Sequence, residues 1–230
     1  MKHILIIIMC ALSGSIIHAQ PLSISDNIKF WSEQMVEHAE FASEFAKDPQ
    51  LKQKGLELSN KFKKINPNDS KAFLALADEI KKYQSQVRAD VKKSYNKKET
   101  AIPLDLLAHM DLETDYAKKK AQGKQLSKHE EAIFWSEEHE GEAKVMAALM
   151  NPKAPALKKE AEAISETLKN NAHIWKGSLE VVENANTELD SIGKQLEKDP
   201  SKTKIPAKLA EHEKRERARA AQTFKQLEVQ

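Results

Sequence analysis

Apolar residues recur every three or four positions along most of this chain, the spacing that places side chains on one face of an α-helix. The clearest stretch covers residues 26–47, with Asp26 as a suitable N-cap and Asp48-Pro49 as the break that follows it. Its predicted inward stripe consists of Trp31, Met35, His38, Ala42 and Phe45.

Proline and polar breaks divide the rest of the chain into similar amphipathic segments. The sequence has only six glycines, and most prolines stand between one apolar pattern and the next. Short links between amphipathic helices are typical of helical bundles, so we predict an all-α fold. The predicted helices cover residues 26–47, 49–65, 70–98, 102–122, 127–150, 155–169, 171–198 and 206–230.

The second half of the chain repeats landmarks of the first in the same order. Phe30-Trp31-Ser32-Glu33 returns as Phe134-Trp135-Ser136-Glu137, and Ile102-Pro103 returns as Ile205-Pro206. Such order indicates an internal duplication of a unit of about a hundred residues. We predict two tandem four-helix up-and-down bundles, or one composite bundle, with repeats over 20–124 and 125–230.

The first residues form a separate segment. Lys2 and His3 precede an apolar run from Ile4 to Leu12, and Ala19 offers a small residue for cleavage. This pattern predicts a secretory signal peptide over 1–19, with an uncleaved anchor as the alternative. We therefore expect a periplasmic or secreted protein that is not inserted in a membrane after cleavage.

Composition narrows the chemistry of the mature chain. The only cysteine of the full sequence, Cys10, lies in the predicted signal peptide. Disulfides, thiolate metal sites and cysteine nucleophiles are therefore excluded from the mature chain. The 37 basic and 35 acidic residues are interspersed, and no polybasic face indicates binding of nucleic acid. Phosphate-binding loops and hydrolase motifs are also missing from the sequence.

One motif brings polar residues onto apolar helix faces. His109 and Glu113 form H-x-x-x-E after Ile102-Pro103, and His212 and Glu216 form the same motif after the second Ile-Pro. A four-residue step returns to nearly the same face of a helix, so each imidazole and carboxylate project together. Both pairs fall on stripes that otherwise carry Leu, Ala and Tyr.

The first helix of each half supplies further donors. His38 lies on the inward stripe beside Glu37, and the second half offers His139 and Glu142 in the corresponding region. The pairing is ambiguous, because counting from Trp135 matches Glu142 with His38, whereas counting from the following proline matches Glu140 with Glu37.

Imidazole and carboxylate groups from several inward-facing helices are the donors with which bundles bind transition metals. We predict one or two metal ions, iron or manganese with zinc as the alternative. The predicted ligands are His38, His109, Glu113, His139, Glu142, His212 and Glu216. The competing interpretation is a non-catalytic envelope module in which His-Glu pairs only tie helices together.

The motifs also resemble a known family. F-W-x(5)-E-H-A-x-F at residues 30–41, the Asp48-Pro49 break and L-L-x-H-x-x-x-E-x-x-Y at residues 106–116 resemble the uncharacterised two-repeat ferritin-like bacterial proteins, some labelled as spore-coat proteins. The resemblance implies tandem ferritin-like bundles with metal bound by the first and fourth helices of each repeat. It carries over to His38, His109, Glu113, His212 and Glu216.

The sequence departs from that family pattern in two places. The second repeat has Glu140-Gly141-Glu142-Ala143 in place of E-H-A, and Arg219 stands where the first repeat has Tyr116. The motif H-x-x-x-E also differs from the E-x-x-H of typical di-iron bundles. An activity therefore does not follow from the resemblance, although a metal-dependent redox role is one expectation.

Overall fold

The computed structural model of the chain describes residues 22–96, 99–174 and 177–228. Over these ranges it forms eight α-helices, one short 3-10 turn and a single isolated bridge between Met150 and Thr203, which confirms the all-α prediction. The predicted signal peptide at 1–19 lies outside the described residues. The helices are α1 (Ile24–Phe45), α2 (Pro49–Phe62), α3 (Ser70–Ser94), α4 (Ala101–Ala121), α5 (Lys128–Leu149), α6 (Pro155–His173), α7 (Leu179–Lys198) and α8 (Ala207–Glu228), with the turn η1 at Pro200–Lys202.

Local caps set where the helices begin. Asp26 was predicted as the first N-cap, but Ser23 takes that position, and Asp26 completes a capping box by accepting from the Ser23 backbone. Ser127 and Glu130 form the same box at the start of α5. Asp48 caps α2, whose first residue is the predicted proline. Both boxes satisfy N–H groups that have no partner inside the helix.

The predicted start of the seventh helix at Asn171 was wrong. The sixth helix continues to His173, and α7 begins only at Leu179. The buried Asn171 amide donates to the Ser136 hydroxyl and to the Ser178 carbonyl, and its oxygen accepts from the Ser178 backbone N–H. These bonds hold the end of α6 against the residue that precedes α7. Asn171 therefore lies inside α6, near its end, and does not begin α7.

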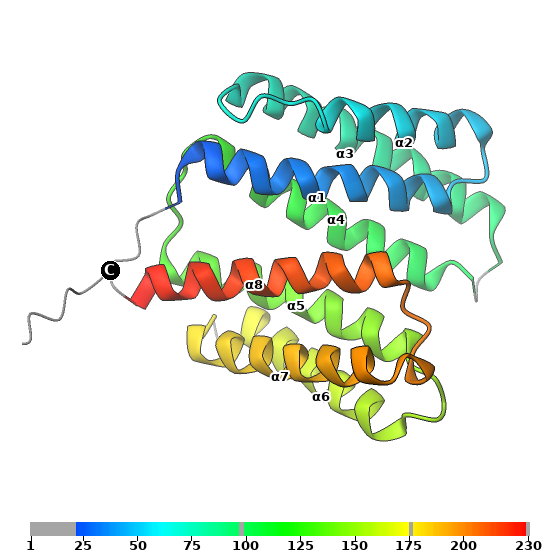
Figure 1. The fold of residues 1–230 in the computed structure, drawn as a ribbon, viewed down its shortest axis with the longest axis vertical. Helices are drawn as coiled ribbons and strands as arrows, with labels where there is room; N and C mark the ends of the chain where they lie inside the picture. Colours follow the sequence, from blue (N-terminus) through cyan, green and yellow to red (C-terminus); the bar gives the residue numbers. More distant parts are fainter. Residues whose placement is uncertain (1–21, 97–98, 175–176, 229–230) are drawn as a thin grey trace, which may run out of the picture.

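The helices pack as layered pairs (Figure 1). One outer pair is α2 and α3, the next pair is α1 and α4, then come α8 and α5, and α7 and α6 form the other outer pair. The predicted boundary between residues 124 and 125 falls in the link between α4 and α5. The inner pairs therefore bring the first and last helices of each half face to face.

Side chains fix the direction of the contact between α1 and α8. Asn27, near the start of α1, accepts a hydrogen bond of 2.6 Å from Arg219, in the second half of α8. Glu40, near the end of α1, pairs with Lys208 at the start of α8. The two helices thus run antiparallel, and together with α4 and α5 they form a composite inner bundle.

The apolar core continues across the contact between the halves. One cluster of buried side chains runs from Ile28 and Trp31 of α1 through Leu107 of α4 to Trp135 of α5 and Phe224 of α8. A smaller cluster lies between α5, α6 and α7. Since burial of apolar surface is the main stabilising contribution, the inner bundle and its two outer pairs stabilise one another. None of the described helices combines the length and apolar character that a membrane span requires.

Candidate metal centre

The seven predicted donor residues all face the interior of the inner bundle. None is more than 6 % exposed, and His38, Glu113, His139 and Glu216 are completely buried. They come from four helices that are distant in sequence but adjacent in space, α1, α4, α5 and α8. Charged groups are almost never buried to this extent without a partner, so the arrangement of their donor atoms decides what the centre can hold.

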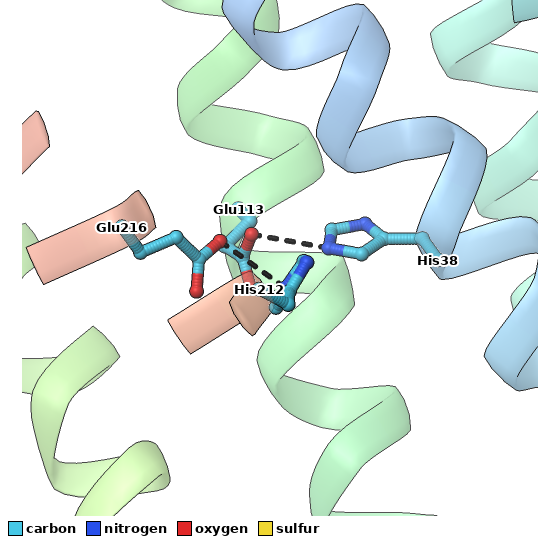
Figure 2. Close-up of side chains that lie close together, drawn as sticks. All are labelled: His38, Glu113, His212 and Glu216. Atoms are coloured by element: carbon cyan, nitrogen blue, oxygen red, sulfur yellow. Dashed lines mark ion pairs between the residues drawn. The ribbon is translucent and has the colours of Figure 1, made fainter. Parts of the chain in front are cut away.

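A first group combines two histidines and two glutamates. Figure 2 shows His38 from α1, Glu113 from α4, and His212 with Glu216 from α8 converging on one point. Nε2 of His38 lies 3.1 Å from Oε2 of Glu113, and Nε2 of His212 lies 3.3 Å from Oε1 of Glu216. One donor atom of each residue lies within 4.8 Å of the others. Ligands at about 2.0–2.2 Å from one ion are at most about 4.4 Å apart, so this spacing is close to that of a metal site.

A second group lies beside the first and shares Glu216 with it. Its other members are His109 from α4, Glu138 from α5 and Glu213 from α8, again with donor atoms within 4.8 Å of one another. Nε2 of His109 lies 3.9 Å from Oε2 of Glu216 and 2.8 Å from Oε1 of Glu113. Two glutamates therefore lie between the two groups, as bridging carboxylates do in dinuclear sites.

The two remaining predicted residues belong to a third group. His139 and Glu142 of α5 join Glu138, and Nδ1 of His139 lies 3.5 Å from Oε2 of Glu142. Arg217 of α8 donates to the other oxygen of Glu142. Because the Arg217 guanidinium already neutralises the charge of Glu142, this third group attracts a cation less strongly than the first two groups do.

Many donor atoms of these groups make no hydrogen bond with any described residue. This holds for both ring nitrogens of His38, His109 and His139 and for both carboxylate oxygens of Glu113, Glu138 and Glu213. The imidazole and carboxylate edges approach one another without hydrogen-bond geometry. Buried polar atoms nearly always have a partner, and this set of donor atoms at ligand spacing could hold a metal ion.

An outer contact orients one histidine of the first group. Nδ1 of His212 lies 2.7 Å from Oε2 of Glu37, which is also bound by Arg215. This contact favours the proton on Nδ1 and leaves the lone pair of Nε2 directed toward Glu216. Metal-binding histidines commonly donate their second nitrogen to a carboxylate in this way. Gln34 adds a hydrogen bond of 2.8 Å to Glu216.

Burial and neighbouring carboxylates disfavour ionisation of two glutamates of α8. Burial, reinforced by Glu113, raises the pKa of Glu216 to about 8. Burial and the nearby Glu142 also raise the pKa of Glu213 well above its usual value. A cation at either position would favour the ionised carboxylates that metal coordination needs.

The histidines respond to the same carboxylates. Burial disfavours the charged form of His139, but Glu138 outweighs it and raises the pKa of His139 to about 9. Burial likewise opposes ionisation of Glu113, yet His38 and His109 hold the pKa of Glu113 well below its usual value.

Formal charges give a count for the cations. Glu113, Glu138, Glu142, Glu213 and Glu216 contribute five buried carboxylates to the three groups. Arg217 is the one guanidinium that pairs with any of them among the described residues. Four negative charges remain when all five carboxylates are ionised and the imidazoles are neutral, the states that metal coordination needs, and two divalent cations would balance them.

Sequence reasoning missed Glu138 and Glu213. Each lies where the first half has a different residue. Gln34 stands 104 positions before Glu138, and Met110 stands 103 positions before Glu213, which are the offsets between the repeated landmarks. A repeat is recognised from residues that both halves share, so residues that differ between the halves give no signal of this kind. Helical spacing could have identified Glu138, because Glu138 and Glu142 follow the buried Trp135 by three and seven residues and so share its face of the helix.

The departure at Gly141 has a steric reason. A Cβ atom on residue 141 would lie 2.9 Å from Nδ1 of His109, closer than real Cβ contacts. A cavity of about 280 Å³ opens beside this pair, between α4, α5 and the end of α6. Glycine at this position therefore lets the imidazole of His109 reach the second group.

Packing also explains why Arg219 stands where the first repeat has Tyr116. Tyr116 stacks on Phe134 with ring centroids 3.6 Å apart, and Arg219 lies over the ring of Phe30 at 4.8 Å. Tyr116 thus covers Phe134 by ring stacking, and Arg219 covers Phe30 by a cation–π contact. Each phenylalanine belongs to one of the two Phe-Trp landmarks. Neither Tyr116 nor Arg219 belongs to the donor groups.

No family model and no curated protein matches this sequence. The fold is similar to that in a crystal structure of an uncharacterized protein from Bacillus cereus G9241, with a TM-score of 0.63 and 14 % sequence identity. The similarity covers 89 % of this chain and 90 % of that chain. At this identity the likeness concerns the fold alone.

Proposed function

We propose that the protein binds two divalent transition-metal ions at neighbouring positions that share Glu216. The first is surrounded by His38, Glu113, His212 and Glu216, and the second by His109, Glu138, Glu213 and Glu216. The observation that carries the proposal is the set of buried imidazole nitrogens and carboxylate oxygens at ligand spacing without hydrogen-bond partners among the described residues. Mixed nitrogen and oxygen donors suit iron and manganese best, with zinc as the alternative.

The contacts argue against donors that only tie helices together. Pairs with that role would complete hydrogen bonds, as Tyr116 does by donating to Glu131 over 2.6 Å. In the centre, Glu113 has two histidine nitrogens within 3.1 Å but no hydrogen bond of good geometry. Leaving buried charged groups unsatisfied is costly, so a bound cation explains this set better.

A metal-dependent redox role is part of the proposal. Each position has four protein donors, whereas iron and manganese commonly take up to six ligands. Room therefore remains for a small exogenous ligand such as oxygen or peroxide. The shared carboxylate would hold the two ions about 3.5–4 Å apart, the separation found in two-metal sites.

We also propose that the two halves arose by duplication of one ferritin-like unit and that the protein is exported. The repeated landmarks, the matching capping boxes at Ser23 and Ser127, and the pairing of α1 with α4 and of α5 with α8 support the duplication. The apolar segment at 1–19 supports export to the periplasm or the medium.

Metal analysis tests the binding directly. Protein purified without an affinity tag should contain about two equivalents of metal per chain, since two positions share one bridge. The double variant His109→Ala, His212→Ala removes one nitrogen ligand from each position and should lose nearly all of it. Elemental analysis after gel filtration measures both.

The matched control for the double variant is His129→Ala, His173→Ala, because these two histidines are exposed and belong to none of the donor groups. It should keep the wild-type metal content. Equal metal content in both double variants, or a metal-free wild type after growth with added iron and manganese, would contradict the proposal.

Gly141→Ala should affect the second position alone. The new methyl group would push the imidazole of His109 away from Glu138 and Glu216. We expect the affinity of one ion to fall about 10–100-fold, the usual effect of a misplaced ligand, while the other is retained. Calorimetric titration of the metal-free protein measures this. Glu137→Ala, which alters the same cavity without touching His109, should titrate like the wild type.

A further inference from the structure

A second cavity, of about 230 Å³, reaches the centre from the side of α7. It lies between α5, α7, α8 and the segment around η1. Its walls are largely apolar and include Val145, Met146, Leu196, Ile205 and Leu209. Its mouth carries the exposed residues Glu197 and Glu211.

The deep end of this cavity is polar and belongs to the centre. Glu142, Glu213 and Arg217 line it, and each is 5 % exposed or less. Glu213 is a donor of the second cation position, so a molecule in the cavity would lie next to that position.

One of these residues, Arg217, has unused hydrogen-bonding capacity. Nε of Arg217 has no acceptor among the described residues, although the guanidinium binds Glu142 through Nη1. A buried N–H without an acceptor is costly. A ligand with an accepting oxygen would therefore gain a hydrogen bond that the free protein lacks.

The guanidinium is held in place by the backbone of α7. A Cβ atom on residue 193 would lie 3.0 Å from Nη2 of Arg217, so Gly193 makes room for the guanidinium against α7. In the first half the position that corresponds to Arg217 is Thr114, whose hydroxyl donates to the Met110 carbonyl. The polar end of this cavity is thus a feature of the second half.

We infer that this cavity binds a small, mainly apolar, uncharged molecule with one hydrogen-bond-accepting oxygen, such as an alcohol or ketone. The role of this molecule as a substrate of the metal centre rests on the proposed function, whereas its binding in the cavity does not. A carboxylate ligand is disfavoured because Glu142 and Glu213 already face one guanidinium. An apolar cavity of about 150 Å³ can hold benzene, so this cavity of about 230 Å³ has room for a molecule of about seven or eight non-hydrogen atoms.

The probe that tests this is 1-hexanol, titrated into the full chain with ¹³C-labelled methionine methyl groups. The methyl signal of Met146, which lines the cavity, should shift and saturate, while that of Met35 in the first half stays in place. Hexanoate and 1-chlorohexane should bind about tenfold more weakly or worse, since one adds a charge and the other lacks the oxygen.

Two variants of α8 make the test specific. Ala210→Phe fills the cavity and should abolish the Met146 shift, whereas Ala218→Phe, on the exposed face of the same helix, should leave it unchanged. No saturable shift in the wild type, or an equal shift in Ala210→Phe, would overturn the inference. Metal content is measured on the same samples. Two equivalents of metal without hexanol binding would refute only this inference, and hexanol binding without metal would refute only the proposed metal site.

Discussion

Glu216→Gln should abolish binding of the metal pair and at the same time stabilise the metal-free protein. Glu216 is the one residue shared by both cation positions, so its loss removes a ligand from each. Without metal, the same carboxylate is completely buried and faces Glu113. Glutamine keeps its shape and can still contact Gln34 and His212, but it carries no charge.

The sign of the stability change follows from the pKa. The pKa of Glu216 is raised by burial to about 8 in the folded protein, above the ordinary value of 4.5 for a glutamate, so the folded state holds the proton more tightly. Rising pH then favours the unfolded state of the wild type, from about pH 4.5 until about pH 8. At pH 7 the penalty relieved by glutamine is about 3 kcal/mol, and the advantage of the variant should grow from pH 5 to pH 8.

Urea unfolding of metal-free protein at several pH values measures this advantage. The matched control is Glu131→Gln, because Glu131 is also buried but accepts from Tyr116 and pairs with Lys120. That variant should lose stability and keep its metal. If Glu216→Gln also lost stability at pH 7 and bound metal normally, Glu216 would have only a structural role.

Removal of metal from the wild type should lower its melting temperature strongly. A ligand at a free concentration 1,000-fold above its Kd stabilises the folded state by about 4 kcal/mol, so two such ions contribute about 8 kcal/mol. For a chain of this size each kcal/mol corresponds to about 2–4 °C. We therefore expect a decrease on the order of 20 °C between manganese-loaded protein and protein with excess chelator, measured by differential scanning calorimetry.

The variant His109→Ala, His212→Ala serves as the control for this measurement. Without metal to remove, its melting temperature should change little when chelator is added. A wild type that melts at the same temperature with and without chelator would show that no cation contributes to the folded state.

Helical periodicity was sufficient to predict the all-helical fold, most of its helices and the burial of the donors. The stripe from Trp31 to Ala42 is buried as predicted, and His38 lies within it. The start of α7 could not be predicted in this way, because Asn171 satisfies a turn through Ser136, which is 35 positions earlier in the chain. Local capping preferences do not include such distant partners.

The grouping of the donors needed the tertiary structure. Spacing within a helix shows that His212 and Glu216 share a face, but not that Glu37 of α1 would bind the second nitrogen of His212. It also does not show that Glu216 lies between His109 and His212. These relations depend on the packing of α8 against α1, α5 and α7, which no local pattern specifies.

We propose above all that two cations lie on either side of the Glu216 carboxylate. An anomalous difference map from crystals of manganese- or iron-loaded protein tests it most directly. We predict two peaks about 3.5–4 Å apart inside the inner bundle, one beside His38 and His212 and one beside His109 and Glu138. A map with peaks only at the protein surface, or with no peak among these side chains, would contradict the account.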